Sequence, residues 1–325
     1  MGDRLTVGHR RRWWPPRGRV LVVATGVGLL LASVAGVIVL RRDGPGRPPA
    51  PPPGGVEVLA ASDVASCDTD TDEQTARLLD GLPGTVLVLG DTAYDDGTAE
   101  EFRRCYAPTW GRHRHRSRPV PGNHDYGDDD AGDDRASGYF DYFGETAGTE
   151  GEGWYSFDLG SWHLVALNSN CRKIGGCQAG SAQERWLRAD LAGNATRCTL
   201  AYWHHPFVSS GRKHGAAEAM APLWQALFEH GADVVLSGHE HHYERFAPLD
   251  AEGRPAPGGG MRQFVVGTGG GEELYKFDDP VPGSEYRDNT SYGVLRLSLL
   301  EGAYEWRFLP AGGQGPSDHE RDSCR

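Results

Sequence analysis

The sequence predicts an α/β domain with mixed sheets over about residues 56–312. The first observation is that Val56–Ala61, Asp72–Gly81 and Thr85–Leu89 have the patterns of a strand, a helix and a strand. That order is typical of a parallel βαβ unit. The second observation is a pair of apolar runs within residues 154–167, separated by a Gly-Ser turn, which predicts an antiparallel hairpin. A chain with both kinds of connection favours mixed sheets.

The rest of the domain continues the alternation of helices and strands. Helices are expected at Ala182–Ala192 and Ala216–His230. Strands are expected at Thr199–Trp203, Ala232–Leu236, Arg262–Val266, Tyr292–Leu299 and Tyr304–Leu309. The last segment, residues 313–325, is polar, and we expect a tail that Cys324 pins to the domain.

The composition excludes several classes of protein. The chain has 325 residues, 38% of them hydrophobic, with 46 Gly, 21 Pro and a formal charge of −12. This content excludes a wholly disordered chain, a collagen, a coiled coil and a multi-span membrane protein. The acidic balance argues against nucleic acid as a main partner, because phosphate backbones attract basic surfaces.

The N-terminal segment predicts a membrane anchor. Residues 1–19 are basic and residues 20–40 carry no charge, and such a run of 21 residues spans roughly 30 Å as a helix. The arginines before the run predict a cytoplasmic N-terminus, with the rest of the chain outside the cell. Residues 41–55 form a Pro/Gly-rich linker. The alternative is a signal peptide cleaved near Ser33-Val34-Ala35, which would give a secreted protein.

The cysteines predict disulfide bonds. All six follow the apolar run, and an even number outside the cytoplasm is typical of a disulfide framework, for which six cysteines allow 15 pairings. Cys171 and Cys177 bracket a Gly-containing loop and form the first expected pair. Zinc ligation is the weaker alternative, because no two cysteines have the CxxC spacing.

Polar side chains follow four of the expected strands and the Pro119–Pro121 segment, at the kind of position where ligand sites of α/β sheets lie. Carboxylate, amide and imidazole groups together suit Fe, Mn or Zn. With Tyr94 there are seven candidate metal ligands: Asp63, Asp91, Tyr94, Asn123, His204, His239 and His241. Seven ligands are too many for one tetrahedral zinc and suit two octahedral ions that share a carboxylate.

The motifs around these residues resemble those of the calcineurin-like metallophosphoesterases, and within them the purple acid phosphatases. The matching blocks are Asp63, Gly90-Asp91-Thr92-Ala93-Tyr94, Gly122-Asn123-His124-Asp125, His204-His205-Pro206 and Gly238-His239-Glu240-His241. The resemblance implies a single catalytic domain built as a four-layer α/β/β/α sandwich of two mixed sheets.

The resemblance also implies how the ligands are shared. Asp63, Tyr94 and His241 would hold Fe(III), while Asn123, His204 and His239 would hold Fe, Zn or Mn. Asp91 would bridge the two ions. The chain departs from the family's GDxG block, since it has Ser62-Asp63-Val64-Ala65 there. Ala65 cannot ligate, and Tyr94 is the natural replacement for the histidine that other metallophosphoesterases use.

The function implied is an acid phosphatase-like hydrolase that cleaves small phosphomonoesters by attack of a metal-bound hydroxide. His124 would be the general acid, Asp125 would orient its ring, and His214 would contact the substrate. One alternative is a phosphodiesterase or nucleotide pyrophosphatase. Another is a non-catalytic cell-surface binding module, which we expect to have lost a ligand or His124. The sequence carries no signal for the oligomeric state.

Overall fold

The computed structural model describes residues 54–127, 135–313, 315 and 318–325. Two groups of expected residues lie outside this part of the chain, namely the basic N-terminus with the apolar run at 20–40 and nearly all of the linker at 41–55. Those expectations therefore stay predictions. Within the part that is described, no helix is both long enough and apolar enough to cross a bilayer.

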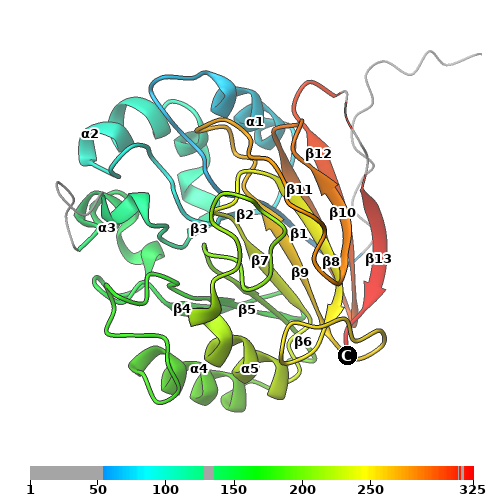
Figure 1. The fold of residues 1–325 in the computed structure, drawn as a ribbon. Coiled ribbons are helices and arrows are strands. Elements are labelled where there is room, and N and C mark those ends of the chain that lie inside the picture. Colours follow the sequence, from blue (N-terminus) through cyan, green and yellow to red (C-terminus); the bar gives the residue numbers. More distant parts are fainter. Residues whose placement is uncertain (1–53, 128–134, 314, 316–317) are drawn as a thin grey trace, which may run out of the picture. The chain divides into compact units, whose positions relative to one another are not determined.

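Two mixed β-sheets and their helices make up the described domain (Figure 1). The strands are β1 (Val56–Ala61), β2 (Thr85–Val88), β3 (Ser117–Pro119), β4 (Tyr155–Leu159), β5 (Trp162–Ala166), β6 (Cys198–Tyr202), β7 (Val234–Ser237), β8 (Tyr243–Leu249), β9 (Met261–Val266), β10 (Ser284–Asp288), β11 (Gly293–Leu300), β12 (Ala303–Pro310) and β13 (His319–Ser323). The helices are α1 (Thr71–Asp80), α2 (Ala99–Glu101), α3 (Ser137–Phe143), α4 (Ala182–Gly193) and α5 (Ala221–Glu229).

Short helical segments complete the elements, a π-helical one at Phe102–Tyr106 and 3₁₀ segments at Trp110–Arg116, His124–Tyr126, Gly144–Ala147 and Glu218–Met220.

The strand order confirms the predicted fold class. One sheet runs β13-β12-β11-β1-β2-β3 and the other β10-β8-β9-β7-β6-β5-β4. Strands β1, β2 and β3 are parallel, as are β5, β6, β7 and β9, while the outer strands pair antiparallel. The parallel strands of each sheet end in loops that carry the polar motifs. The predicted βαβ unit and hairpin are both present.

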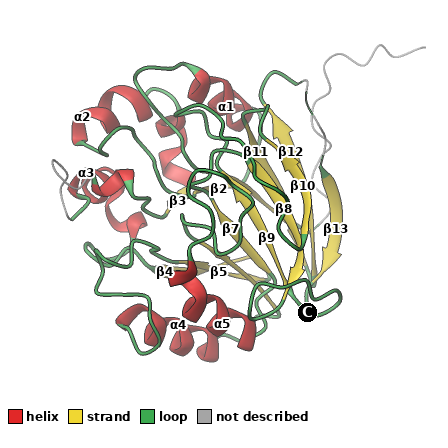
Figure 2. Cartoon of the chain, in the orientation of Figure 1, coloured by secondary structure: helices red, strands yellow, loops and turns green. Residues whose placement is uncertain are grey.

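The core follows the alternation of side chains along the strands. In β5 and β6, Leu164 and Leu200 pack in the cluster that also contains Val58 and Leu87 of the other sheet. Val165 and Ala201, one residue further along each strand, pack instead in the cluster formed with α4 and α5. This period of two places the seven-stranded sheet between the other sheet and its helices. In Figure 2 the helices lie outside the strands.

The C-terminal segment differs from the predicted tail. Residues 319–323 form β13, which pairs antiparallel with β12 and closes one edge of the six-stranded sheet. Cys324 is disulfide-bonded to Cys198 at the start of β6. The sequence did not predict this strand, because charged side chains are typical of an edge strand as well as of a tail.

The disulfides confirm the prediction for the cysteines. Cys171–Cys177 is bonded as expected, and the remaining pairs are Cys67–Cys105 and Cys198–Cys324. The third bond joins residues 126 positions apart. It therefore fastens the last strand of the chain to the other sheet.

A buried histidine fastens the hairpin β4–β5 to α4. His163 Nδ1 lies 2.8 Å from Asp158 Oδ1, and His163 Nε2 lies 2.8 Å from Asp190 Oδ2. Burial alone would lower the pKa of His163, but the bonds to Asp190 and Asp158 outweigh it and raise the pKa. Both ring nitrogens donate only when the imidazole is charged.

We predict that His163→Gln lowers the free energy of unfolding by about 1 kcal/mol near pH 5.5 and by less near pH 9. The stabilisation is fully present below the unfolded pKa of about 6.5 and is lost as pH rises through the raised folded pKa. Denaturant unfolding at both pH values measures it. His115→Gln, an exposed histidine, is the control. An equal loss at both pH values would contradict the role of the charged ring.

Candidate metal centre

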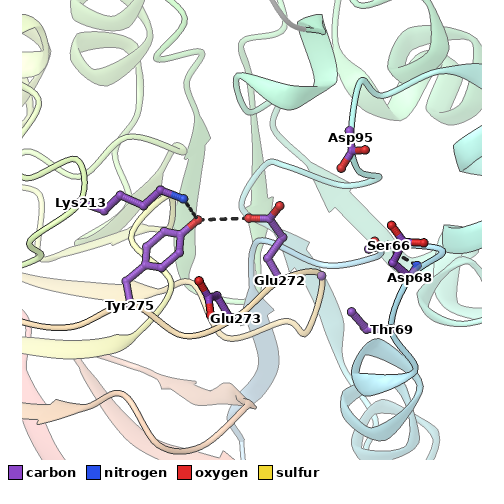
Figure 3. Close-up of a pocket in the computed structure, with 9 residues that line it drawn as sticks. Ser66, Asp68, Thr69, Asp95, Lys213, Glu272, Glu273 and Tyr275 are labelled. Atoms are coloured by element: carbon purple, nitrogen blue, oxygen red, sulfur yellow. Dashed lines mark hydrogen bonds between the residues drawn. The ribbon is translucent and has the colours of Figure 1, made fainter.

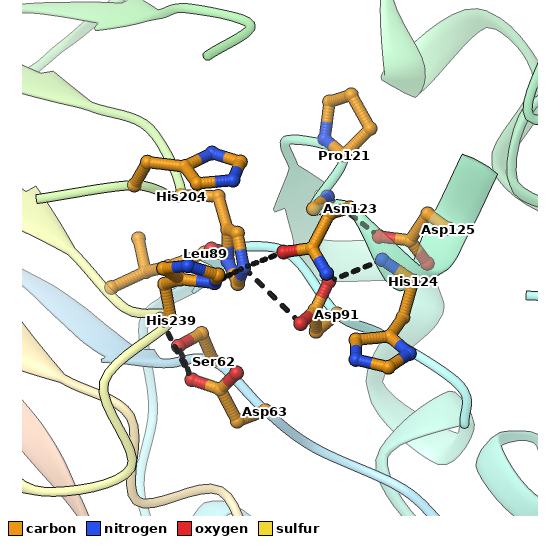
Figure 4. Close-up of polar contacts among 12 residues, drawn as sticks. Ser62, Asp63, Leu89, Asp91, Pro121, Asn123, His124, Asp125, His204 and His239 are labelled. Carbon is orange, nitrogen blue, oxygen red and sulfur yellow. Dashed lines mark hydrogen bonds and ion pairs between the residues drawn. The ribbon is translucent and has the colours of Figure 1, made fainter. Parts of the chain in front are cut away.

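The site lies where parallel strands of both sheets end. Asp63 follows β1, Asp91 follows β2, and Asn123 follows the loop after β3. His204 follows β6 and His239 follows β7 in the other sheet. Because the sheets face each other, these loops meet, and Figure 4 shows the side chains converging from both. The structure thus brings the five motifs to one place.

Three of the candidate ligands have a strained backbone. Asp63, Asp91 and His239 have φ values of 59°, 47° and 68°, in the left-handed region that non-glycine residues rarely adopt. Such a conformation costs of order 1–3 kcal/mol per residue and persists only where the surrounding structure enforces it. Figure 4 shows the side chains of all three at the centre.

The first group of ligand atoms surrounds the phenol of Tyr94. Its Oη lies 3.0 Å from Asp63 Oδ1, 3.2 Å from Asp91 Oδ2 and 3.2 Å from His241 Nε2. His241 Nε2 lies 3.3 Å from Asp63 Oδ1. These atoms are therefore mutual neighbours.

The second group surrounds His204. Its Nε2 lies 3.2 Å from each of Asp91 Oδ2, Asn123 Oδ1 and His239 Nδ1. Asp91 Oδ2 thus belongs to both groups. The structure brings all seven sequence-predicted ligands together, with Asp91 between the two sets.

The donor set fits metal ions. Ligand bonds of about 2.0–2.2 Å put neighbouring ligands of an octahedral ion about 3 Å apart, which is the spacing of both groups. His204 Nδ1 donates to the carbonyl of Leu89, and His241 Nδ1 donates to that of Glu273. These bonds keep the proton on Nδ1 and turn Nε2 of both rings toward the centre, where it could bind a metal ion in place of its own proton.

The charges at the centre also call for cations. Asp63 and Asp91 are both 1% exposed. Burial would raise the pKa of Asp91, but the imidazoles of His204 and His124 hold it well below its usual range. Burial and the carboxylates of Asp63 and Asp91 raise the pKa of Tyr94 well above its usual range. A phenolate therefore forms there only beside a strong positive charge.

Gly122 lets the motif at residues 122–125 approach the motif at residues 90–94. A Cβ on Gly122 would lie 2.1 Å from Asp91 Oδ1 and 2.3 Å from the Asp91 backbone nitrogen. No side chain fits at that distance. The glycine before Asn123 is therefore required for Asn123 and Asp91 to share the centre.

The ring of His124 has a partner other than the expected one. His124 Nδ1 lies 2.6 Å from the carbonyl oxygen of Asp95 and donates to it. The carboxylate of Asp125 instead accepts from the backbone nitrogens of Gly122 and Thr92, at 2.8 and 3.1 Å. The expectation that Asp125 orients the ring is therefore corrected. Asp125 fixes the loops that carry the ligands, and the sequence could not reveal a backbone acceptor.

His214 and His205 lie next to the ligands. The ring of His214, which is exposed, stands over His239 with centroids 4.2 Å apart. His205 Nδ1 lies 2.7 Å from Ser169 Oγ, and its ring is 4.3 Å from that of His239. Burial, followed by the charge of His204, lowers the pKa of His205 to about 3. His205 thus packs as a neutral ring behind the ligands.

Sequence reasoning missed the residues that wrap His241. Tyr275 stacks on His241 with centroids 3.9 Å apart and planes at 15°, and the carbonyl of Glu273 accepts from the same ring. The glycine-rich segment at residues 267–273 brings the Glu273 carbonyl to this ring. Its contacts run largely through the backbone and leave no motif.

The family comparison agrees with this geometry. The family model described as calcineurin-like phosphoesterase matches residues 57–243. This chain belongs to the calcineurin-like phosphoesterase family. Within the family, the chain is similar to curated relatives named as purple acid phosphatase or acid phosphatase.

The chain spans only part of the length of the curated relatives that it matches. Purple acid phosphatase 22 of Arabidopsis thaliana is 34% identical over 161 residues, which cover 46% of this chain and 35% of the relative. An uncharacterized protein of Mycobacterium tuberculosis is 31% identical over 185 residues, which cover 50% of this chain and 35% of the relative. Acid phosphatase type 7 of Homo sapiens is 27% identical over 260 residues, covering 69% and 57%. The matches thus span about a third to a half of most relatives.

Solved structures share the fold. Purple acid phosphatase PPD1 from yellow lupin seeds has a TM-score of 0.66 at 18% identity, covering 85% of this chain and 55% of that one. GAP50, described as the anchor in the inner membrane complex of Plasmodium, has a TM-score of 0.62 at 13% identity, covering 84% and 90%. These likenesses confirm the two-sheet architecture.

We predict that Asp91→Asn lowers the metal content of the purified phosphoesterase from about two ions per chain to one or fewer. The amide keeps the shape but removes the charge that both ligand groups share. Elemental analysis after exhaustive dialysis measures it. Asp158→Asn, in β4 and bonded to His163 rather than to a candidate ligand, is the matched control and should keep the wild-type content. Unchanged metal content in Asp91→Asn would contradict a shared ligand.

Proposed function

We propose that this phosphoesterase is a dinuclear-metal, acid phosphatase-like hydrolase of small phosphomonoesters. The observation that supports the proposal most is the convergence of seven ligand atoms in two groups that share Asp91 Oδ2. Asp63, Tyr94 and His241 would hold one ion, and Asn123, His204 and His239 the other. We propose Fe(III) at the Tyr94 site and Fe, Zn or Mn at the second.

The bound ions would supply a nucleophile from water at neutral pH and neutralise the phosphate oxygens. The chain's own residues position the reaction. The Asp95 carbonyl accepts a hydrogen bond from Nδ1–H of His124, so in the charged ring Nε2 carries the proton that can be given to the leaving oxygen. His214, above His239, is placed to contact a phosphate oxygen.

A pocket of about 320 Å³ lies beside the centre and would receive the leaving group (Figure 3). Tyr275 connects the two, because it lines the pocket and stacks on His241. The pocket is lined by four carboxylates, one lysine and small or polar groups: Ser66, Asp68, Thr69, Asp95, Lys213, Gly271, Glu272, Glu273 and Tyr275.

This lining favours one class of phosphate ester. Four carboxylates against Lys213 repel a leaving group that carries further phosphates, while an uncharged or cationic leaving group is accepted. The excess of negative charge therefore supports a simple monoesterase over the alternative nucleotide pyrophosphatase.

We further propose that the catalytic domain, residues 56–312 with β13, works outside the cytoplasm. Its three disulfides support an oxidising compartment. Residues 1–19 would remain cytoplasmic, 20–40 would anchor the chain in the membrane, and 41–55 would be the spacer. Cleavage of the N-terminal segment would instead release a secreted enzyme.

We predict that the metal-loaded protein releases phosphate from p-nitrophenyl phosphate faster than it releases p-nitrophenol from bis(p-nitrophenyl) phosphate. We also predict that the His124→Ala variant loses more activity on alkyl phosphates than on p-nitrophenyl phosphate. An alkoxide leaving group needs a proton more than p-nitrophenolate does, so we expect about a 100-fold loss in kcat for the alkyl ester and about 10-fold for the nitrophenyl ester.

His115→Ala, an exposed histidine of the 3₁₀ segment at Trp110–Arg116, is the control and should change neither rate. Equal losses on both esters would remove His124 as the proton donor. An inactive wild type with two ions bound would overturn the proposed function itself.

We predict that Asp68→Asn combined with Glu272→Gln raises kcat/KM for ATP about 3- to 10-fold relative to p-nitrophenyl phosphate, because two repelling charges are removed. Glu301→Gln in the β11–β12 turn, at the opposite end of the sheet, is the control. The gain should shrink in high salt, which screens exposed charges. An unchanged ratio would contradict the charge-based selection.

A further inference from the structure

The loop at residues 209–215 carries His214 to the mouth of the site. Arg212, Lys213 and His214 are all exposed, yet the ring of His214 stands in one place over the ligand His239. An exposed ring on a loop holds a fixed position only if its backbone is fastened. The fastening group lies beneath the loop.

That group is the carboxylate of Glu240, the residue between the ligands His239 and His241. Glu240 is fully buried. Its Oε1 accepts a hydrogen bond from the backbone nitrogen of His214 at 2.6 Å and another from the backbone nitrogen of Gly215. Two N–H groups on one carboxylate oxygen are charge-assisted bonds, which are roughly twice as strong as neutral ones.

The loop is shaped to receive this carboxylate. A Cβ on Gly211 would lie 2.1 Å from Glu240 Cδ and 2.3 Å from Oε2, so only glycine fits there. Oε2 has no hydrogen-bond partner among the residues that the structure describes. A buried carboxylate with a spare oxygen is costly, which favours a specific role over general packing.

We propose that Glu240 is the positioning residue for His214. Through the two N–H bonds it fixes the loop so that the imidazole lies above His239, where a phosphate oxygen would bind. Glu240 itself touches neither the substrate nor the ligand atoms. The inference rests on the proposed function, in which His214 contacts the phosphate.

The same segment provides an internal comparison. Glu244, four residues further on, accepts from the backbone nitrogen of Ser210 at 2.9 Å and from Ser284 Oγ at 2.7 Å. It fastens the start of the loop and the neighbouring β10, whereas Glu240 fastens the residue that carries the imidazole. Loss of Glu240 should therefore act on His214, and loss of Glu244 on the stability of the domain.

The kinetic test is a double-mutant cycle on the metal-loaded full chain. We expect Glu240→Gln and Glu240→Ala to lower kcat/KM for p-nitrophenyl phosphate about 3-fold and about 10-fold, because Gln retains one acceptor oxygen. His214→Ala should lower it about 10-fold. The double variant His214→Ala/Glu240→Ala should be no worse than His214→Ala alone, because both remove the same contact.

A second measurement does not depend on activity. Hydrogen exchange should show that the amides of His214 and Gly215 lose protection at least about tenfold in Glu240→Gln, while those of β6 do not change. Elemental analysis should show unchanged metal content. Glu57→Gln, a buried carboxylate bonded to Arg296 and Ser298, is the control and should alter neither the loop amides nor kcat/KM.

The outcomes separate the two proposals. Multiplicative losses in the double variant, or unchanged protection of the loop amides, would overturn the role of Glu240. If wild type is inactive on every ester but Glu240→Gln still frees the two amides, the proposed function fails and the loop attachment stands. Loss of metal in Glu240→Gln would show that the residue supports the ligands instead.

Discussion

The structure depends on two buried carboxylates held close together. Asp63 and Asp91 share the neighbour Tyr94 Oη, and both are almost fully buried. Like charges in such a place repel each other and cost free energy unless cations lie beside them. Histidines supply part of this compensation in the protein alone, and bound metal ions would supply the rest. The rest of the domain can be understood as the support that keeps these two groups in place.

That support comes from the packing of two sheets. Asp63 and Asp91 follow adjacent parallel strands of one sheet, whereas His204 and His239 follow parallel strands of the other. The shared core between the sheets, with large buried side chains such as Trp162 and Phe264, fixes the distance between the two sets of loops. The left-handed conformations of three ligands are maintained by this packing, because the loops alone would relax.

The sequence predicted the parts of the site that depend on side-chain type. Asp63, Asp91 and His204 follow apolar runs, and the alternation of His239 with His241 places both rings on one side, so the ligand set could be inferred. Contacts made by the backbone could not, since the carbonyl of Asp95 leaves no trace in its side chain. Strands β8, β10 and β13 were also missed, because Tyr243–Leu249 and the edge segments are rich in charged residues that pair or lie exposed.

The distribution of charge around the site separates binding of the phosphate from selection of its ester. The centre would be positive once ions are bound, and it attracts the phosphoryl group of any ester. The adjoining pocket is negative, with Asp68 and Glu272 on its wall. Under the proposed function the metal attraction would act on every substrate alike, so the pocket would select between substrates by the charge of the leaving group. Glu240 differs from both the ligand carboxylates and those of the pocket. It is buried under the loop at residues 209–215 and binds the backbone N–H groups of that loop. The carboxylates of this domain thus have different proposed roles: Asp63 and Asp91 as ligands, Asp68 and Glu272 in substrate selection, and Glu240 in attachment of the loop.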